Sequence, residues 1–143
     1  MAAEARNRTT ALVIDDDEQI GRLIKECLSD VDTETLKSRA ELMERLKQPP
    51  VDAVLLDWRL QDGDGISLID SIRDAWPETS IILITGFTSE EIIIRAIKRG
   101  AFYFLSKPFN TATLRQTVKR ATENTRICTA AMAARTLAIT NSA

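Results

Sequence analysis

The chain has 143 residues, of which 44% are hydrophobic and 28% charged, with a formal net charge of −2, two cysteines and no histidine. These values are typical of a single globular domain. They give no electrostatic reason to expect direct nucleic-acid binding, and no apolar stretch approaches the ~20 residues of a membrane-spanning helix. Without histidine, His-based acid–base chemistry, His-containing metal sites and a phosphohistidine-carrier role are excluded, and the low cysteine count favours a cytoplasmic location.

The first third of the chain alternates short apolar runs with helical patterns. The β-branched, apolar run at 10–15 predicts a strand. Residues 17–29 carry apolar side chains at helical spacing, which predicts an amphipathic helix. The polar segment 32–37 is expected to be an edge strand, and a second helix over 38–48 is stopped by two prolines.

The same two patterns continue through the rest of the chain. They predict strands at 52–57, 80–85 and 101–106, and helices at 66–76, at 88–99 and from about 111 to at least 125. The Ala- and Thr-rich tail, 126–143, could be a helical extension, a linker or a disordered tail.

Five predicted strands alternate with five predicted helices. Short connections between them imply βαβ units around a parallel sheet, and therefore an α/β fold in one domain. The central strands are continuous apolar runs, as expected when helices cover both faces of a sheet. We expect this domain at 10–125, after a disordered N-terminus at 1–9.

Polar residues follow the predicted strands where ligands bind in open parallel sheets, beyond the carboxyl ends. Asp15 and Asp16 end the first strand, Asp57 the third and Thr85 the fourth, while Lys107 follows the fifth. These side chains are far apart in sequence. We expect them to converge at one edge of the sheet.

Three neighbouring carboxylates repel one another unless a cation lies among them. Mg²⁺ prefers oxygen ligands and often shares its coordination shell with a phosphate. The ammonium group of Lys107 and the hydroxyl of Thr85 could contact a phosphoryl group, and an Asp carboxylate can itself be the nucleophile that becomes an aspartyl phosphate.

Residues from about 10 to 125 resemble the receiver domain of bacterial two-component response regulators. The order and spacing of four segments carry this resemblance: "LVIDDDE" at 12–18, "LLDWRLQDGDG" at 55–65, "ILITG" at 82–86 and "GAFYFLSKPF" at 100–109. The resemblance implies a flavodoxin-like, doubly wound sheet of five parallel strands in the order 2-1-3-4-5, with five helices.

The resemblance also assigns roles to the acids. It implies that Asp57 accepts a phosphoryl group from a phosphohistidine on a sensor histidine kinase or a histidine phosphotransfer protein. It implies a Mg²⁺ cofactor held by Asp16, by Asp57, by the backbone carbonyl of Arg59 and, through water, by Asp15.

The remaining positions match residues that respond to the phosphoryl group. Lys107 corresponds to the lysine that pairs with the phosphoryl oxygens, and its bond to Pro108 to a peptide bond that is usually cis. Thr85 corresponds to the switch hydroxyl, and Phe104 to the aromatic that turns inward with it. Bulk at Phe87 is expected to obstruct the attacking water and slow dephosphorylation.

Several residues have plainer interpretations. Asp17 is expected to cap the first helix, and Asp62 and Asp64 to be turn residues. Four isoleucines between 92 and 97 are expected to be mostly core, with Ile94 or a neighbour partly exposed, as a docking patch or as ordinary aliphatic surface.

The expected function is a phosphorylated signalling switch that is not an enzyme beyond its own phosphorylation and dephosphorylation. Two alternatives stay open: a pseudo-receiver that takes no phosphate, and a Mg²⁺-dependent phosphohydrolase. A homodimer or a downstream effector could bind the face formed by the helix at 88–99 and the strand at 101–106. We expect no contact with membrane. The sequence leaves open whether the chain acts alone or belongs to a longer regulator.

Overall fold

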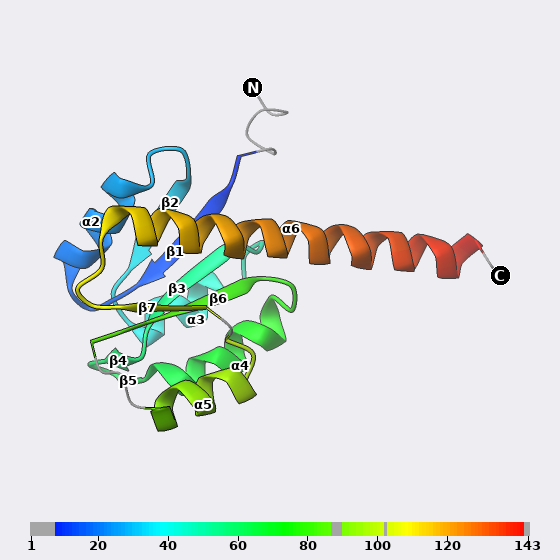
Figure 1. Cartoon of the computed structure of the whole chain (residues 1–143). Helices are drawn as coiled ribbons and strands as arrows, with labels where there is room; N and C mark the ends of the chain where they lie inside the picture. Colours follow the sequence, from blue (N-terminus) through cyan, green and yellow to red (C-terminus); the bar gives the residue numbers. More distant parts are fainter. Residues whose placement is uncertain (1–7, 87–89, 102, 142–143) are drawn as a thin grey trace.

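The computed structural model describes residues 8–86, 90–101 and 103–141. Residues 1–7 of the expected N-terminal segment lie outside this range. Five parallel strands form the central sheet in the order β2-β1-β3-β6-β7 (Figure 1). Their bounds are β1 Thr10–Ile14, β2 Asp32–Leu36, β3 Ala53–Asp57, β6 Ser80–Thr85 and β7 Tyr103–Ser106. The predicted α/β fold and its strand order are confirmed, with the polar segment β2 at the edge.

Five helices cover the two faces of this sheet. They are α2 Glu18–Cys27, α3 Arg39–Arg45, α4 Gly65–Ala75, α5 Glu90–Lys98 and α6 Thr111–Asn141. Helices α2 and α6 pack on one face, whereas α3, α4 and α5 pack on the other (Figure 1). The two-layer cover explains why the central strands are apolar along their whole length.

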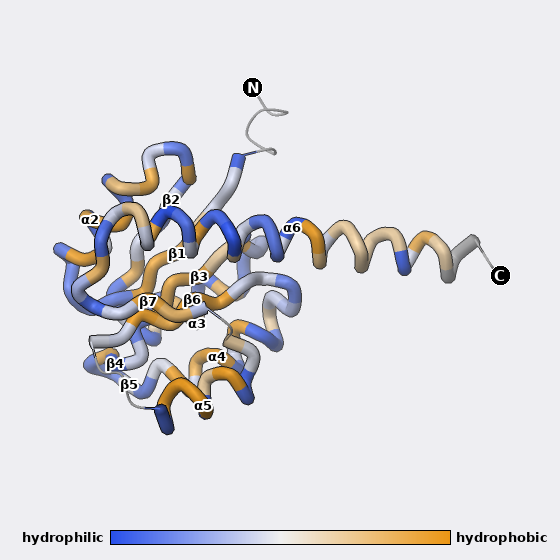
Figure 2. The backbone as a smooth tube through the Cα atoms, viewed as in Figure 1, coloured by the Kyte–Doolittle hydropathy of each residue, from blue (hydrophilic) through white to orange (hydrophobic). Residues whose placement is uncertain are grey.

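The alternation of side chains along the strands builds two separate cores. In β3, Val54 and Leu56 point into the core beneath α3, α4 and α5, while Ala53 and Leu55 point into the core beneath α2 and α6. Every residue of β3 and β6 is buried. Figure 2 shows these strands as the apolar centre of the molecule. Both β3 and β6 are therefore packed between helices on their two faces up to their last residues.

The helix ends follow the capping rules in most places. Asp17 accepts a hydrogen bond from the Gln19 N–H and caps α2, as predicted. Gly100 has φ of 106° beyond the end of α5, a conformation that favours glycine. The Lys107–Pro108 peptide bond is cis, as the resemblance implied.

A short antiparallel hairpin follows β3 and was not predicted. It pairs β4 (Arg59–Leu60) with β5 (Gly63–Asp64). Strands of two residues are too short to show an alternating pattern, so the sequence offered no signal for them. The hairpin leads directly into α4.

Helix α6 is longer than its predicted minimum. It runs without interruption from Thr111 to Asn141, 31 residues, and its second half extends beyond the sheet (Figure 1). Leu114, Val118 and Ala121 are buried against the sheet, whereas Ile127 is 68% exposed. In the described part of the chain, no helix combines the length and apolarity needed to cross a membrane.

The isoleucines of α5 are less buried than expected. In this helix Ala96 is buried, Ile92 and Ile93 are partly buried, and Ile94 and Ile97 are 51% and 41% exposed. The prediction that these isoleucines are mostly core is therefore wrong, because a short helix buries one narrow stripe. The expected exposure at Ile94 is confirmed.

Candidate functional site

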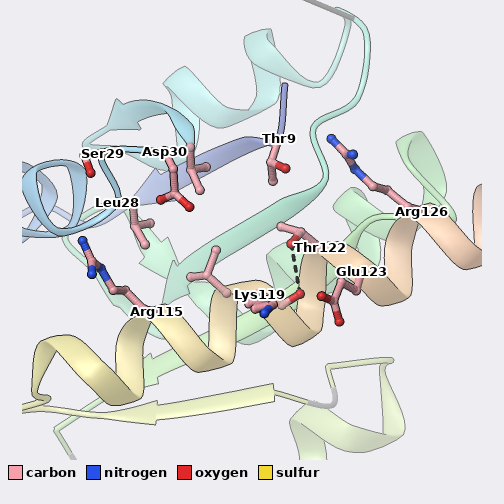
Figure 3. A pocket seen from close by; sticks show the side chains of 11 residues that line it. Thr9, Leu28, Ser29, Asp30, Arg115, Lys119, Thr122, Glu123 and Arg126 are labelled. Carbon is pink, nitrogen blue, oxygen red and sulfur yellow. Dashed lines mark hydrogen bonds between the residues drawn. The ribbon is translucent and has the colours of Figure 1, made fainter. Parts of the chain in front are cut away.

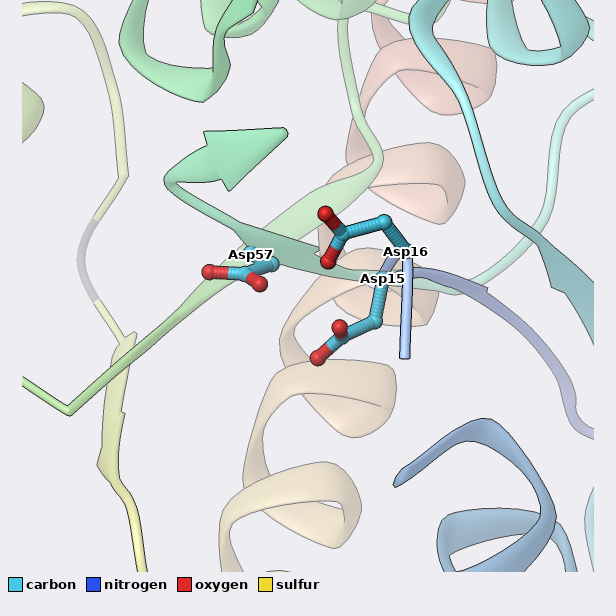
Figure 4. A group of neighbouring side chains, drawn as sticks. All are labelled: Asp15, Asp16 and Asp57. Atoms are coloured by element: carbon cyan, nitrogen blue, oxygen red, sulfur yellow. The ribbon is translucent and has the colours of Figure 1, made fainter. Parts of the chain in front are cut away.

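The three acids meet at the carboxyl edge of the sheet. Strands β1 and β3 are neighbours with Ile14 level with Leu56, so Asp15 and Asp57 leave the sheet side by side. Asp16 lies next to them, and one carboxylate oxygen from each acid lies within 4.8 Å of the others. Figure 4 shows the three side chains grouped at these strand ends. The predicted convergence of the acids is what the fold produces.

Lys107 joins this group from the fifth strand. Its Nζ donates hydrogen bonds to Asp15 Oδ2 at 2.9 Å and to Asp57 Oδ2 at 3.4 Å. Its backbone N–H donates to the carbonyl oxygen of Thr85 at 2.8 Å, which fixes the start of the loop after β7 against the end of β6. One ammonium group thus contacts two carboxylates.

The acid at the centre of the site is poorly solvated. Asp57 is only 7% exposed. The pKa of Asp57 is raised to about 6, because burial and, less strongly, the nearby Asp15 carboxylate outweigh the lowering effects of the Arg59 backbone N–H and the Lys107 ammonium. The pKa of Lys107 is raised: burial lowers it, but its hydrogen bonds and charge interactions with Asp15 and Asp57 prevail.

The donor set suits a divalent cation such as Mg²⁺. Three acids and one ammonium leave an excess of negative charge, and all the available side-chain ligand atoms are oxygens. Hard cations prefer such ligands. Asp15 and Asp57 are buried while Asp16 is the most exposed of the three, so the group is reachable from solvent on one side.

The two predicted switch residues lie on neighbouring strands. Thr85 is the last residue of β6 and is 2% exposed. Phe104, in β7, is partly buried and packs against the core beneath α3, α4 and α5. Strands β6 and β7 pair with Leu83 level with Phe104. Thr85 is therefore two residues beyond the residue that pairs with Phe104, and both side chains lie on the face of the sheet that α5 covers. Phe87, expected to affect dephosphorylation, lies outside the described residues.

Gly65 is a site residue that sequence reasoning missed. Its N–H donates to the Trp58 carbonyl oxygen at 2.7 Å. A Cβ atom at Gly65 would lie 2.4 Å from the Asp57 carbonyl oxygen and 2.6 Å from the Trp58 Cα. The first residue of α4 thus packs directly against the backbone of Asp57. A side chain at Gly65 would displace that backbone. In a loop rich in Gly and Asp, the sequence does not indicate which glycine makes such a contact.

The turn residues also do more than predicted. Asp64 caps α4 by accepting from the Ile66 N–H at 2.8 Å. Asp62 accepts from the backbone N–H groups of Arg39 and Ala40, at 3.0 and 3.3 Å, across 23 and 22 residues of sequence. The interpretation of Asp62 as a simple turn residue is therefore incomplete.

A cavity of about 500 Å³ lies elsewhere, between α6 and the loop after α2 (Figure 3). Thr9, which precedes β1, lines it, so it opens at the opposite edge of the sheet from the acids. It contains none of the predicted site residues. Two of its basic side chains already have partners, Arg115 on the Cys27 carbonyl oxygen and Arg126 on Asp52.

Comparison with known proteins places this site in a family context. The family model of the response regulator receiver domain matches residues 11–119. The response regulator protein PilR of Pseudomonas aeruginosa is 37% identical over 117 residues, which cover 80% of this chain and 26% of that protein. A putative NtrX-like response regulator of Rickettsia felis is 34% identical over 120 residues, covering 81% of this chain and 25% of that protein.

Solved structures agree with these relatives. The beryllofluoride-activated NtrC4 receiver domain dimer has a TM-score of 0.76 at 34% identity and covers 81% of this chain and 98% of its own. NtrX from Brucella abortus, in complex with ADP, has a TM-score of 0.79 at 31% identity, covering 86% of this chain and 29% of its own. The chain spans about a quarter of the length of the curated relatives it matches.

Proposed function

The chain belongs to the response regulator receiver domain family of two-component signalling, and from this premise we propose that Asp57 is its phosphoacceptor. One observation carries the proposal: Asp57 ends a rigid, buried strand where Asp15, Asp16 and Lys107 converge on it. The partner is a phosphohistidine on a sensor histidine kinase or a histidine phosphotransfer protein. The proposed receiver unit is 10–125, with 126–143 as a C-terminal extension, in the cytoplasm as is general for bacterial response regulators.

The proposed reaction is the transfer of a phosphoryl group between side chains. A carboxylate oxygen of Asp57 attacks phosphorus, a P–O bond forms, the P–N bond to the donor histidine breaks, and its electron pair returns to the imidazole nitrogen. No proton has to leave Asp57, because the attacking group is already ionised above its raised pKa. The contribution of the surrounding residues is therefore orientation and charge stabilisation.

The other site residues have distinct roles in this proposal. The Lys107 ammonium, now on Asp15 and Asp57, would pair with a phosphoryl oxygen. The Arg59 N–H donates to Asp57 Oδ1 at 3.2 Å and orients the carboxylate. Asp16, Asp57 and the Arg59 carbonyl would hold Mg²⁺ directly, and Asp15 through water. When bound, Mg²⁺ supplies the positive charge that offsets the phosphoryl oxygens.

Phosphorylation is proposed to shift an existing equilibrium between two conformations. The Thr85 hydroxyl would move to donate to a phosphoryl oxygen, and Phe104, now partly buried, would turn further inward. This would change the face made by α5 and β7, where Ile94 is half exposed. A second copy of the chain or a downstream effector would bind that face, since receiver domains of this family dimerise and its longer relatives carry further domains.

Intact mass spectrometry tests the proposal. We expect the protein, incubated with Mg²⁺ and a small-molecule phosphodonor, to gain one phosphoryl group that hydroxylamine removes. Asp57→Ala, and wild-type protein with a chelator, should gain none. A purified histidine kinase or phosphotransfer protein replaces the small donor in a second arm. Failure of both donors on folded, Mg²⁺-binding protein would overturn the phosphoacceptor assignment in favour of a pseudo-receiver.

A further inference from the structure

The loop that follows Asp57 is fastened to a distant helix. Asp62 lies at its tip, between β4 and β5, and its two carboxylate oxygens accept from the first two backbone N–H groups of α3, those of Arg39 at 3.0 Å and Ala40 at 3.3 Å. These hydrogen bonds hold the pKa of Asp62 below its usual range, with the Arg39 N–H as the largest cause. A charged acceptor on N–H groups at a helix start is a favourable arrangement.

A second contact closes the same loop from the other side. The side chain of Arg39 lies over Gly63, where an added Cβ would be 3.3 Å from its Cδ. Its guanidinium donates to Ser67 Oγ at 3.0 Å, and that hydroxyl donates to the Asp64 carbonyl oxygen at 2.8 Å. The start of α3 thus holds the hairpin through its backbone at Asp62 and through its side chain at Gly63.

The other end of the hairpin reaches the phosphoacceptor. The Arg59 N–H donates to Asp57 Oδ1, and Leu60 is buried in the core. Arg59 pairs with Asp64 in the β4–β5 hairpin. The hairpin therefore connects its tip at Asp62 to the backbone at Arg59, two residues after Asp57. Gln61 provides no backbone rigidity of its own at this point, since only proline fixes φ.

We propose that Asp62 is a positioning residue for the phosphoacceptor site: by clamping the β4–β5 hairpin to α3, it holds the Arg59 backbone in place toward Asp57 and the cation. This inference rests on the proposed function, because it assigns the Arg59 carbonyl to Mg²⁺. Without the clamp, the loop samples positions in which that oxygen points elsewhere. The cation then binds only the fraction of molecules in which the loop is ordered. The apparent Kd rises as that fraction falls.

A Mg²⁺ titration of nitrogen-15-labelled protein, followed by the amide signals of residues near Asp57, tests the clamp. The test variants are Asp62→Ala, which removes both acceptor oxygens, and Asp62→Asn, which retains one. The matched control is Ser38→Ala. It removes the N-cap of α3, which accepts from the Glu41 N–H at 3.2 Å, and among the described residues the Ser38 side chain makes no hydrogen bond to the hairpin.

We expect Asp62→Ala to raise the Mg²⁺ Kd about three- to tenfold, Asp62→Asn to raise it less, and Ser38→Ala to leave it within about twofold. Amide exchange at Arg59 and Leu60 should accelerate in Asp62→Ala, less in Asp62→Asn, and not in Ser38→Ala. The phosphorylation rate at low Mg²⁺ should fall as the Kd rises and recover when Mg²⁺ is saturating, a signature that general destabilisation does not produce.

The outcomes separate this inference from the proposed function. If wild-type protein neither binds Mg²⁺ nor accepts phosphate, the proposed function fails and the clamp has no role in it. If wild-type protein does both and Asp62→Ala has an unchanged Kd, the clamp is refuted while the phosphoacceptor stands. An equal rise in Ser38→Ala also refutes it, because the effect then comes from the stability of α3.

Discussion

At the scale of single residues, the site gathers negative charge at a cost in stability. Asp57 is buried beside Asp15, and Lys107 only partly compensates the two negative charges. The pKa of Asp57 is raised to about 6, mainly by burial. For an acid with a raised pKa, the folded state binds its proton more tightly than the unfolded state does. Ionising Asp57 therefore costs folding free energy, which a bound cation would offset.

We expect Asp57→Asn to stabilise the Mg²⁺-free protein in a pH-dependent way. Between the ordinary aspartate pKa of 3.8 and the folded pKa of about 6, the wild type loses stability as the pH rises, whereas the asparagine stays neutral. The stability gained by Asp57→Asn should be near zero below the ordinary aspartate pKa. It should level off above the folded pKa, at about 1–2 kcal/mol once solvent screening is allowed for.

Urea unfolding at a series of pH values, with a chelator present, measures this difference. Asp74→Asn removes the same charge from an exposed position of α4 and serves as the control. A stability difference that is flat with pH, or one that the control reproduces, would contradict the electrostatic explanation.

At the scale of elements, one buried hydroxyl of α6 joins this helix to the segments that begin two strands of the sheet. Thr125 Oγ1 accepts from the Ser80 N–H at 2.9 Å and lies 2.5 Å from the Asp52 carbonyl oxygen and 2.7 Å from the Ser80 hydroxyl oxygen. Asp52 and Ser80 stand at the starts of β3 and β6, whose far ends carry Asp57 and Thr85. Beyond Thr125 the helix extends past the sheet (Figure 1), so this hydroxyl is the last buried anchor before that extension.

We expect Thr125→Val to lower the free energy of unfolding by about 1–3 kcal/mol, because the same shape is kept while the Ser80 N–H and the Asp52 carbonyl lose a buried partner. Thr125→Ser keeps the hydroxyl and should lose less. Thermal unfolding of the three proteins checks the stability, and amide exchange along 126–138 checks whether the extension loosens first. Equal stability of valine and threonine would show that the anchor contributes nothing.

At the scale of the whole molecule, cation binding and folding are linked. The acids come from β1 and β3, which are far apart in the chain, and meet only when these two strands pair, so the unfolded chain has no comparable site. A ligand that binds only the folded state stabilises it by about 2.7 kcal/mol at a hundred times its Kd. The stability of this protein should therefore depend on Mg²⁺ concentration.

We expect saturating Mg²⁺ to raise Tm by about 5–10 °C at neutral pH. Asp16→Ala should abolish most of this rise, and KCl at matched ionic strength should reproduce little of it, since screening alone acts weakly on a buried group. Differential scanning calorimetry provides the measurement. A rise that survives in Asp16→Ala would place the cation away from the proposed site.

The sequence by itself determined the alternation of elements, the parallel sheet and the acids that end its strands. In the sequence, buried strands are continuous apolar runs and amphipathic helices show a helical period, and the carboxyl ends of parallel strands meet at one edge in any such sheet. For this reason the positions of Asp15, Asp16, Asp57, Thr85 and Lys107 along the chain were enough to select them as candidate site residues.

Only the tertiary structure decided the contacts that join distant segments. The approach of Gly65 to the Asp57 backbone, the hold of Asp62 on the start of α3 and the anchor at Thr125 each join residues without a periodic signal. The exposure of Ile97, in addition to that expected at Ile94, was likewise set by how α5 lies on its neighbours. Periodicity reports which face of an element is buried, whereas the partner of a single polar group depends on where the chain returns in space.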